Sequence, residues 1–99
     1  MVELDEEGQV NYHALMGLEY VNKNQYEEAY HHLLIAAILK NLGSRYNLGV
    51  LYEFGLGVEQ SLEEAAKWYS ACAGGSEPGI DYPGALQRVI RKKHRQMQR

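Results

Sequence analysis

The chain of 99 residues is short of several residue types, and each shortage excludes a class of protein. It has one cysteine, Cys72, so no disulfide can form within the chain. Only two prolines are present, which argues against long disordered linkers. The longest unbroken apolar run is residues 33–39, far too short to span a bilayer. Residues 1–7 are acidic and have no apolar core, so we expect no signal peptide and a cytoplasmic location.

Positive charge is scarce until the last part of the chain. Residues 1–81 hold 4 Lys or Arg against 13 Asp or Glu, a net charge of −9, whereas residues 82–99 hold 6 basic residues and no acid. The overall charge of −3 therefore hides an acidic body and a basic end. The 45% hydrophobic content is ordinary for a globular protein, and a chain of this length forms one domain with a modest core.

The clearest local pattern is a pair of helices joined by a glycine turn, over residues 44–73. Gly55 and Gly57 interrupt the helical spacing and permit the positive φ that a tight reversal needs. Ser44 is the expected N-cap of the helix before the turn, and Ser61 opens a capping box for the helix after it. The second helix has one apolar face, made of Leu62, Ala65, Ala66, Tyr69, Cys72 and Ala73. The pattern predicts an antiparallel helical hairpin.

A looser copy of this hairpin precedes it. Met16-Gly17-x-x-Tyr20 returns 32 residues later as Leu48-Gly49-x-x-Tyr52. The second helices match at an offset of 36, which aligns Tyr26, Ala29, Leu33 and Ala37 with Leu62, Ala65, Tyr69 and Ala73. The difference is the glycine-rich turn, which the first copy replaces with residues 22–25. Two stacked hairpins of this kind are the building units of an α/α solenoid.

These residues make the chain resemble the Sel1-like repeats, a family of α/α solenoids related to tetratricopeptide repeats. The resemblance is carried by Leu48-Gly49-x-x-Tyr52, Gly55-x-Gly57-Val58, Glu64-Ala65-x-x-Trp68-Tyr69 and Ala71-x-Ala73. It implies a scaffold or adaptor for protein–protein interaction, with no catalysis and no cofactor. Some bacterial relatives pair a cysteine at the position of Cys72 with one in the preceding helix. Arg45 stands at that second position here, so the resemblance gives no reason to expect an oxidising compartment.

The expected architecture is all-α, a short α/α solenoid of two antiparallel helical hairpins plus a C-terminal capping helix. Its parts are an acidic lead-in at 1–9, a tetratricopeptide-like repeat at 10–43, a Sel1-like repeat at 44–79 and a basic capping helix at 80–99. Asp81 or Tyr82 can cap the last helix, with Pro83 in its first turn. We expect its apolar stripe to cover the second hairpin, and the stripe consists of Leu86, Val89, Ile90 and Met97. Its charged face, expected to point to water, consists of Arg88, Arg91, Lys92 and Arg95.

The resemblance also implies where a partner binds, because the first helix of each hairpin lines a concave groove in this family. In this chain these helices offer apolar side chains with polar ones at the edges. The candidate partner-binding residues are Leu18, Val21, Asn22, Tyr46, Val50, Glu53 and Phe54. An apolar groove suits a peptide or an amphipathic helix of a protein partner. A neighbouring repeat or a second copy of the chain, giving a homo-oligomer, is the alternative occupant.

A second class of function is binding of nucleic acid or an anionic membrane surface through the last helix. Its basic run consists of Arg88, Arg91, Lys92, Lys93, Arg95 and Arg99. The competing interpretation is a solvated helix face near a helix C-terminus, where cations are favoured. We therefore expect that nucleic acid is not the partner.

Catalytic and metal sites have little support. A hydrolase, which distant repeat relatives have been suspected to be, would need a nucleophile such as Cys72, and helical spacing places that thiol on an apolar face. The four histidines lack metal-ligand spacing, because His31 and His32 are adjacent and point about 100° apart on a helix. We expect no catalytic residue, metal or cofactor.

Overall fold

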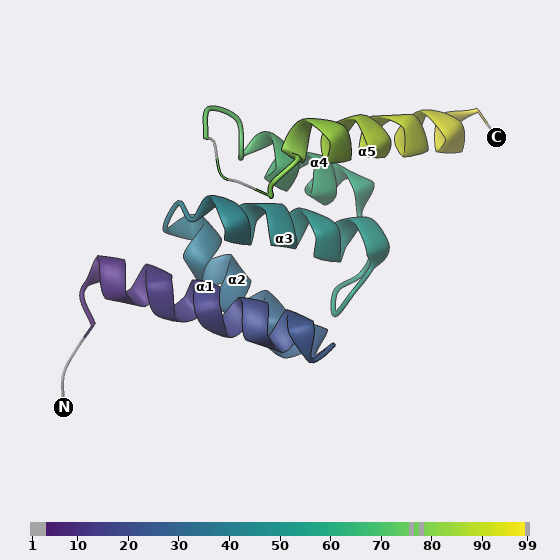
Figure 1. Ribbon diagram of the computed structural model, residues 1–99. Helices are drawn as coiled ribbons and strands as arrows, with labels where there is room; N and C mark the ends of the chain where they lie inside the picture. The colour runs from purple at the N-terminus through teal and green to yellow at the C-terminus, as the bar shows by residue number, and fades with distance from the viewer. Residues whose placement is uncertain (1–3, 76, 78, 99) are drawn as a thin grey trace.

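The computed structural model describes residues 4–75, 77 and 79–98, and these residues form five helices and no strand. The helices are α1 Glu6–Asn22, α2 Tyr26–Ile38, α3 Leu42–Phe54, α4 Leu62–Ser70 and α5 Tyr82–Met97. α1, α3 and α5 run in the same direction, and α2 and α4 return behind them (Figure 1). Each helix packs mainly on its neighbours in the chain, which gives an elongated body of 56 × 28 × 19 Å. The prediction of an all-α solenoid is confirmed.

The first helix begins earlier than the sequence pattern indicated. The Asp5 carboxylate accepts a hydrogen bond of 2.7 Å from the Gly8 amide, and Glu6 and Glu7 lie in the first turn. Negative charge there offsets the partial positive charge of the helix N-terminus. The expectation of a frayed lead-in over residues 1–9 is therefore wrong for residues 6–9, which are helical, whereas residues 1–3 lie outside the described part of the chain.

The N-cap of α3 also differs from the prediction. Asn41, and not Ser44, caps the helix, because its side-chain oxygen accepts a 2.8 Å hydrogen bond from the Ser44 amide. The chain reverses at Lys40, whose φ is +74°, so Asn41 is the first residue placed to begin the next helix. Ser44 is consequently inside the first turn and buried.

The glycine turn has the predicted geometry. Gly55 ends α3 with φ +67°, and Gly57 follows with φ +72°. A Cβ on Gly57 would lie 2.5 Å from the carbonyl carbon of Tyr26, so the turn also packs against the first turn of α2. The Ser61 hydroxyl then accepts a 3.1 Å hydrogen bond from the Glu64 amide and begins α4. The second hairpin and its capping box are confirmed.

The two copies use glycine for the same purpose where their helices cross. A Cβ on Gly17 would lie 2.6 Å from the Leu33 side chain, and a Cβ on Gly49 would collide with the Tyr69 ring. Each glycine lies on the first helix of a hairpin and faces the second helix. The repeated Gly-x-x-Tyr signature therefore marks the closest approach of the two helices.

The apolar interior has two parts. The first lies between α2 and α3 and is made of Ala29, Leu33, Ala37, Leu48 and Leu51. Trp68 is half-buried against it and so joins α4 to the first hairpin. The second part lies between α4 and α5 and is made of Leu62, Ala65, Tyr69, Ala85 and Val89. The contacts therefore continue from one end of the solenoid to the other.

The last helix covers the second hairpin with a different face from the one expected. Ala85 and Val89 are buried, whereas Ile90 is exposed and Met97 is 82% exposed. Ala85 and Val89 share the second core cluster with Tyr69, and Leu86 packs against that cluster. The predicted stripe is wrong at Ile90 and Met97.

Arg45 ties the two hairpins together. Its guanidinium donates a 3.0 Å hydrogen bond to the Ala37 carbonyl and a 2.9 Å hydrogen bond to the Ala71 carbonyl. These carbonyls belong to the ends of α2 and α4, where backbone acceptors lack helical partners. A cation at this point also complements the negative end of each helix dipole.

Candidate interaction groove

The first helices of the two hairpins present an exposed apolar surface. Leu18 on α1 is 46% exposed and Phe54 at the end of α3 is 51% exposed, and the edge residue Asn22 is also exposed. These three candidate residues stand where an incoming partner could contact them. Whether a partner does so remains a prediction.

Three other candidates contribute less free surface than expected. Val21 packs against the first core cluster, and Tyr46 and Val50 pack against the second. The ring centroids of Tyr46 and Tyr69 are 5.5 Å apart. These three side chains are therefore partly committed to the fold, and Tyr46 and Val50 lie on a face of α3 that is covered by the second core cluster.

The hollow itself lies between α1 and the first half of α3, and it has a volume of about 250 Å³. Its lining is Ala14, Leu15, Leu18, Asn41, Gly43, Ser44 and Asn47. Leu15, which is 66% exposed, was not predicted as a site residue. Its spacing of three from Leu18 on one helix was the available signal.

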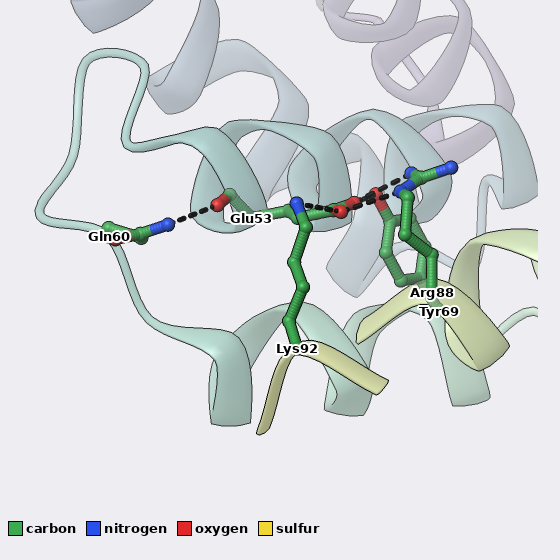
Figure 2. A network of polar contacts seen from close by, with 5 residues as sticks. All are labelled: Glu53, Gln60, Tyr69, Arg88 and Lys92. Atoms are coloured by element: carbon green, nitrogen blue, oxygen red, sulfur yellow. Dashed lines mark hydrogen bonds and ion pairs between the residues drawn. The ribbon is translucent and has the colours of Figure 1, made fainter. Parts of the chain in front are cut away.

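Glu53 is the clearest departure from the predicted groove. It was expected at the groove edge, but its side chain is fully buried. Its Oε1 accepts a 2.8 Å hydrogen bond from the Tyr69 hydroxyl and a 2.7 Å bond from Arg88 Nη2. Its Oε2 accepts 2.6 Å bonds from Arg88 Nε and Lys92 Nζ. Figure 2 shows the three donors converging on the one carboxylate, with Gln60 bonded separately to the Glu53 carbonyl at 2.8 Å.

The electrostatics of this cluster follow from burial and pairing. Burial alone would raise the pKa of Glu53, but the hydrogen bonds from Arg88, Lys92 and Tyr69 outweigh it and lower the pKa to about 2. The carboxylate stays ionised at neutral pH and holds α5 against α3. Arg88 and Lys92 were expected to face water, and that expectation is wrong, because a buried charge must be paired.

The same two cations border the exposed Phe54 ring. Lys92 Nζ lies 4.3 Å from the ring centroid and the Arg88 guanidinium carbon lies 5.8 Å from it. Both distances are within the range of a cation–π contact. Phe54 is therefore held beside α5 rather than standing free at the end of the groove.

The remaining basic residues make a smaller patch than the sequence suggested. Arg91 and Arg95 are exposed and Lys93 is half-buried, whereas Arg99 lies outside the described residues. Arg88 and Lys92 share the single negative charge of Glu53, so the free positive charge of α5 is reduced by one unit. No described helix is both long enough and apolar enough to cross a membrane.

The titratable residues of the structure include a close histidine pair and a buried thiol. Within residues 4–75, 77 and 79–98, no group of three His, Cys, Asp or Glu comes close enough to hold a metal. The structure does bring His13 and His32 together, with their Nδ1 atoms 2.9 Å apart, a contact that the sequence did not predict. The Cys72 thiol is buried, and burial raises its pKa, which disfavours the thiolate that a nucleophile needs.

Comparison with known proteins agrees with the repeated hairpins. The family model described as Sel1 repeat matches residues 8–41 and 43–73, which are the two helical hairpins. The first copy, predicted as a tetratricopeptide-like unit over 10–43, thus matches the same model as the second. Neither a curated protein nor a solved structure matches the chain.

Proposed function

Because this chain belongs to the Sel1 repeat family, whose repeats are generally protein–protein interaction modules, we propose that it binds a protein partner through the groove between α1 and α3. The family is typically a non-catalytic scaffold, which agrees with the buried thiol of Cys72. The observation that carries the proposal is the pair Leu15 and Leu18, two large apolar side chains left open beside a hollow. An exposed apolar patch of this kind marks an interaction site.

The chemistry of the groove indicates the form of the ligand. Leu15, Leu18 and Ala14 give one wall apolar side chains, and the half-buried Asn47 lines the opposite wall. An amide can donate to and accept from a peptide backbone. The ligand that fits is a short peptide, or one turn of an amphipathic helix. It would carry two apolar side chains, spaced so that one contacts Leu15 and the other contacts Leu18.

The experiment starts from peptides selected on the full-length chain from a displayed random library. The dissociation constant of each selected peptide is then measured against wild type, Leu15→Ser and Leu18→Ser. Because burial of a leucine stabilises by about 1.5–3 kcal/mol, each variant should weaken binding at least about tenfold.

Ile38→Ser is the matched control, because Ile38 is 65% exposed and belongs to α2 rather than to the groove. It should change the dissociation constant less than about twofold. Circular dichroism checks that each variant keeps its helices. If both leucine variants bind as wild type does, or if Ile38→Ser is the variant that loses binding, the groove is not the site.

A further inference from the structure

The contact between His13 on α1 and His32 on α2 is not explained by the core or by the groove. The two Nδ1 atoms are 2.9 Å apart and the ring centroids are 5.1 Å apart. The distance between the centroids exceeds the distance between the nitrogens by 2.2 Å, which is about twice the distance from a ring centroid to its own nitrogen. The two nitrogens therefore lie close to the line between the centroids and point at each other. A metal about 2.0–2.1 Å from each nitrogen would have to lie off the line that joins them, whereas the two nitrogens point at each other. The geometry is that of a hydrogen bond with one proton.

Aromatic side chains hold both rings in place. Tyr20 stacks on His32 with centroids 5.5 Å apart and planes 18° from parallel. Tyr12 meets both imidazoles edge-on, at 5.0 Å from His13 and 5.9 Å from His32. The adjacent titratable group is His31, and in the described part of the chain neither ring of the pair forms an ion pair with a carboxylate.

We propose that His13 and His32 form a proton-sensitive clasp between α1 and α2, closed while at least one imidazole is neutral and opened when both are protonated. With both rings neutral, one Nδ1–H donates to the other Nδ1. A first proton can be taken up without losing this bond, because a protonated ring still donates to a neutral one. A second proton leaves two Nδ1–H donors with no acceptor and places two positive charges 2.9 Å apart.

The surroundings of His32 set the direction of the effect. Burial lowers the pKa of His32 from its ordinary value of 6.5, and the neighbouring His13 and His31 lower it further. In an unfolded chain His32 takes up its proton near the ordinary value, whereas in the folded chain it resists protonation. The stability that the clasp contributes is therefore present above about pH 6.5 and is lost progressively as the pH falls below it.

The clasp bears on the groove because α1 carries His13 as well as Leu15 and Leu18, which follow it by two and five residues. If α1 loosens on α2 in mild acid, the groove wall moves with it and peptide affinity should fall. This consequence rests on the proposed function, whereas the clasp itself does not.

The direct test is an NMR titration of the imidazoles in the full-length chain. In wild type, the pKa of His32 should lie below its ordinary value of 6.5. His13→Gln should move the pKa of His32 upward, and His94→Gln, on the distant α5, should not. A His32 pKa at the ordinary value in wild type, or an unchanged pKa of His32 in His13→Gln, would overturn the clasp.

A stability measurement shows whether the pair holds the helices. The melting temperature of wild type should fall between pH 7.5 and pH 5.0 by more than that of the double variant His13→Gln/His32→Gln. His94→Gln, which removes a histidine outside the contact, should keep the larger fall. An equal fall of the melting temperature in the double variant would overturn the proposal. If the double variant does not fold, the NMR titration of His32 in wild type and in His13→Gln decides.

The groove is tested separately by measuring a selected peptide at both pH values. Loss of affinity at pH 5.0 in wild type but not in the double variant supports the link between clasp and groove. If no peptide binds at either pH while the pKa of His32 is lowered in wild type and rises in His13→Gln, the proposed groove fails and the clasp stands.

Discussion

Replacing Glu53 with Gln tests whether a buried carboxylate holds the last helix on the solenoid. The pKa of Glu53 is about 2, against an ordinary value of 4.5, and this difference corresponds to about 3 kcal/mol of preference for the ionised form in the folded state. The Arg88 side chain is 40% exposed, so water weakens part of the pairing. We therefore expect Glu53→Gln to lower the free energy of unfolding at pH 7 by about 2–3 kcal/mol.

The assay is urea unfolding followed by circular dichroism. The dependence of the free energy of unfolding on urea concentration should have the same slope in variant and wild type, so that a shifted midpoint reports a change in stability. Glu19→Gln is the matched control, because Glu19 pairs with Lys23 at 3.2 Å on an exposed helix face and should cost less than about 0.5 kcal/mol. The folded pKa of Glu53 is depressed, so its contribution is present above pH 4.5 and is lost as the pH falls towards 2. The pH dependence between 4.5 and 2 should accordingly be shallower in Glu53→Gln. A loss no larger than that of Glu19→Gln would refute the reasoning.

Two further changes test the turn and the capping helix. Gly57→Val should lower the free energy of unfolding by about 1–3 kcal/mol, because φ at Gly57 is +72° and a Cβ there would clash with the α2 backbone. Thermal melts measure this loss, and an unchanged melting temperature would contradict the geometry. Deletion of residues 82–99 should uncover Tyr69 and leave Glu53 without its cations, so light scattering should show association or aggregation. A stable monomer would mean that α5 is a tail and not a cap.

The repeat pattern was enough to predict the hairpins, because the periodic positions are decided by local geometry. Gly55 and Gly57 adopt the positive φ that their residue type permits, and Ser61 caps α4 as its spacing to Glu64 indicates. Helix ends were harder to place where two capping residues compete. Both Asn41 and Ser44 can cap α3, and the reversal at Lys40 decides between them.

The candidate groove was predicted only in outline. The resemblance to the repeat family placed Leu18 and Phe54 in an open groove, and both are exposed. It could not show that Val50 packs against the second core cluster, because that contact depends on how helices distant in the sequence are arranged around α3. It also missed Leu15, whose exposure results from the gap between two helices distant in sequence.

By itself, therefore, the sequence determined the helices, the turns and the two-copy organisation, since these depend on residue types a few positions apart. The tertiary structure alone decided which side chains from different helices meet. Arg88 and Lys92, which bind the Glu53 carboxylate, lie 35 and 39 residues after it in the sequence. His32 lies 19 residues after His13. No periodicity connects such positions, because the crossing and rotation of whole helices bring them together. The buried charge cluster and the histidine clasp are for that reason features of the packed solenoid and not of any single repeat.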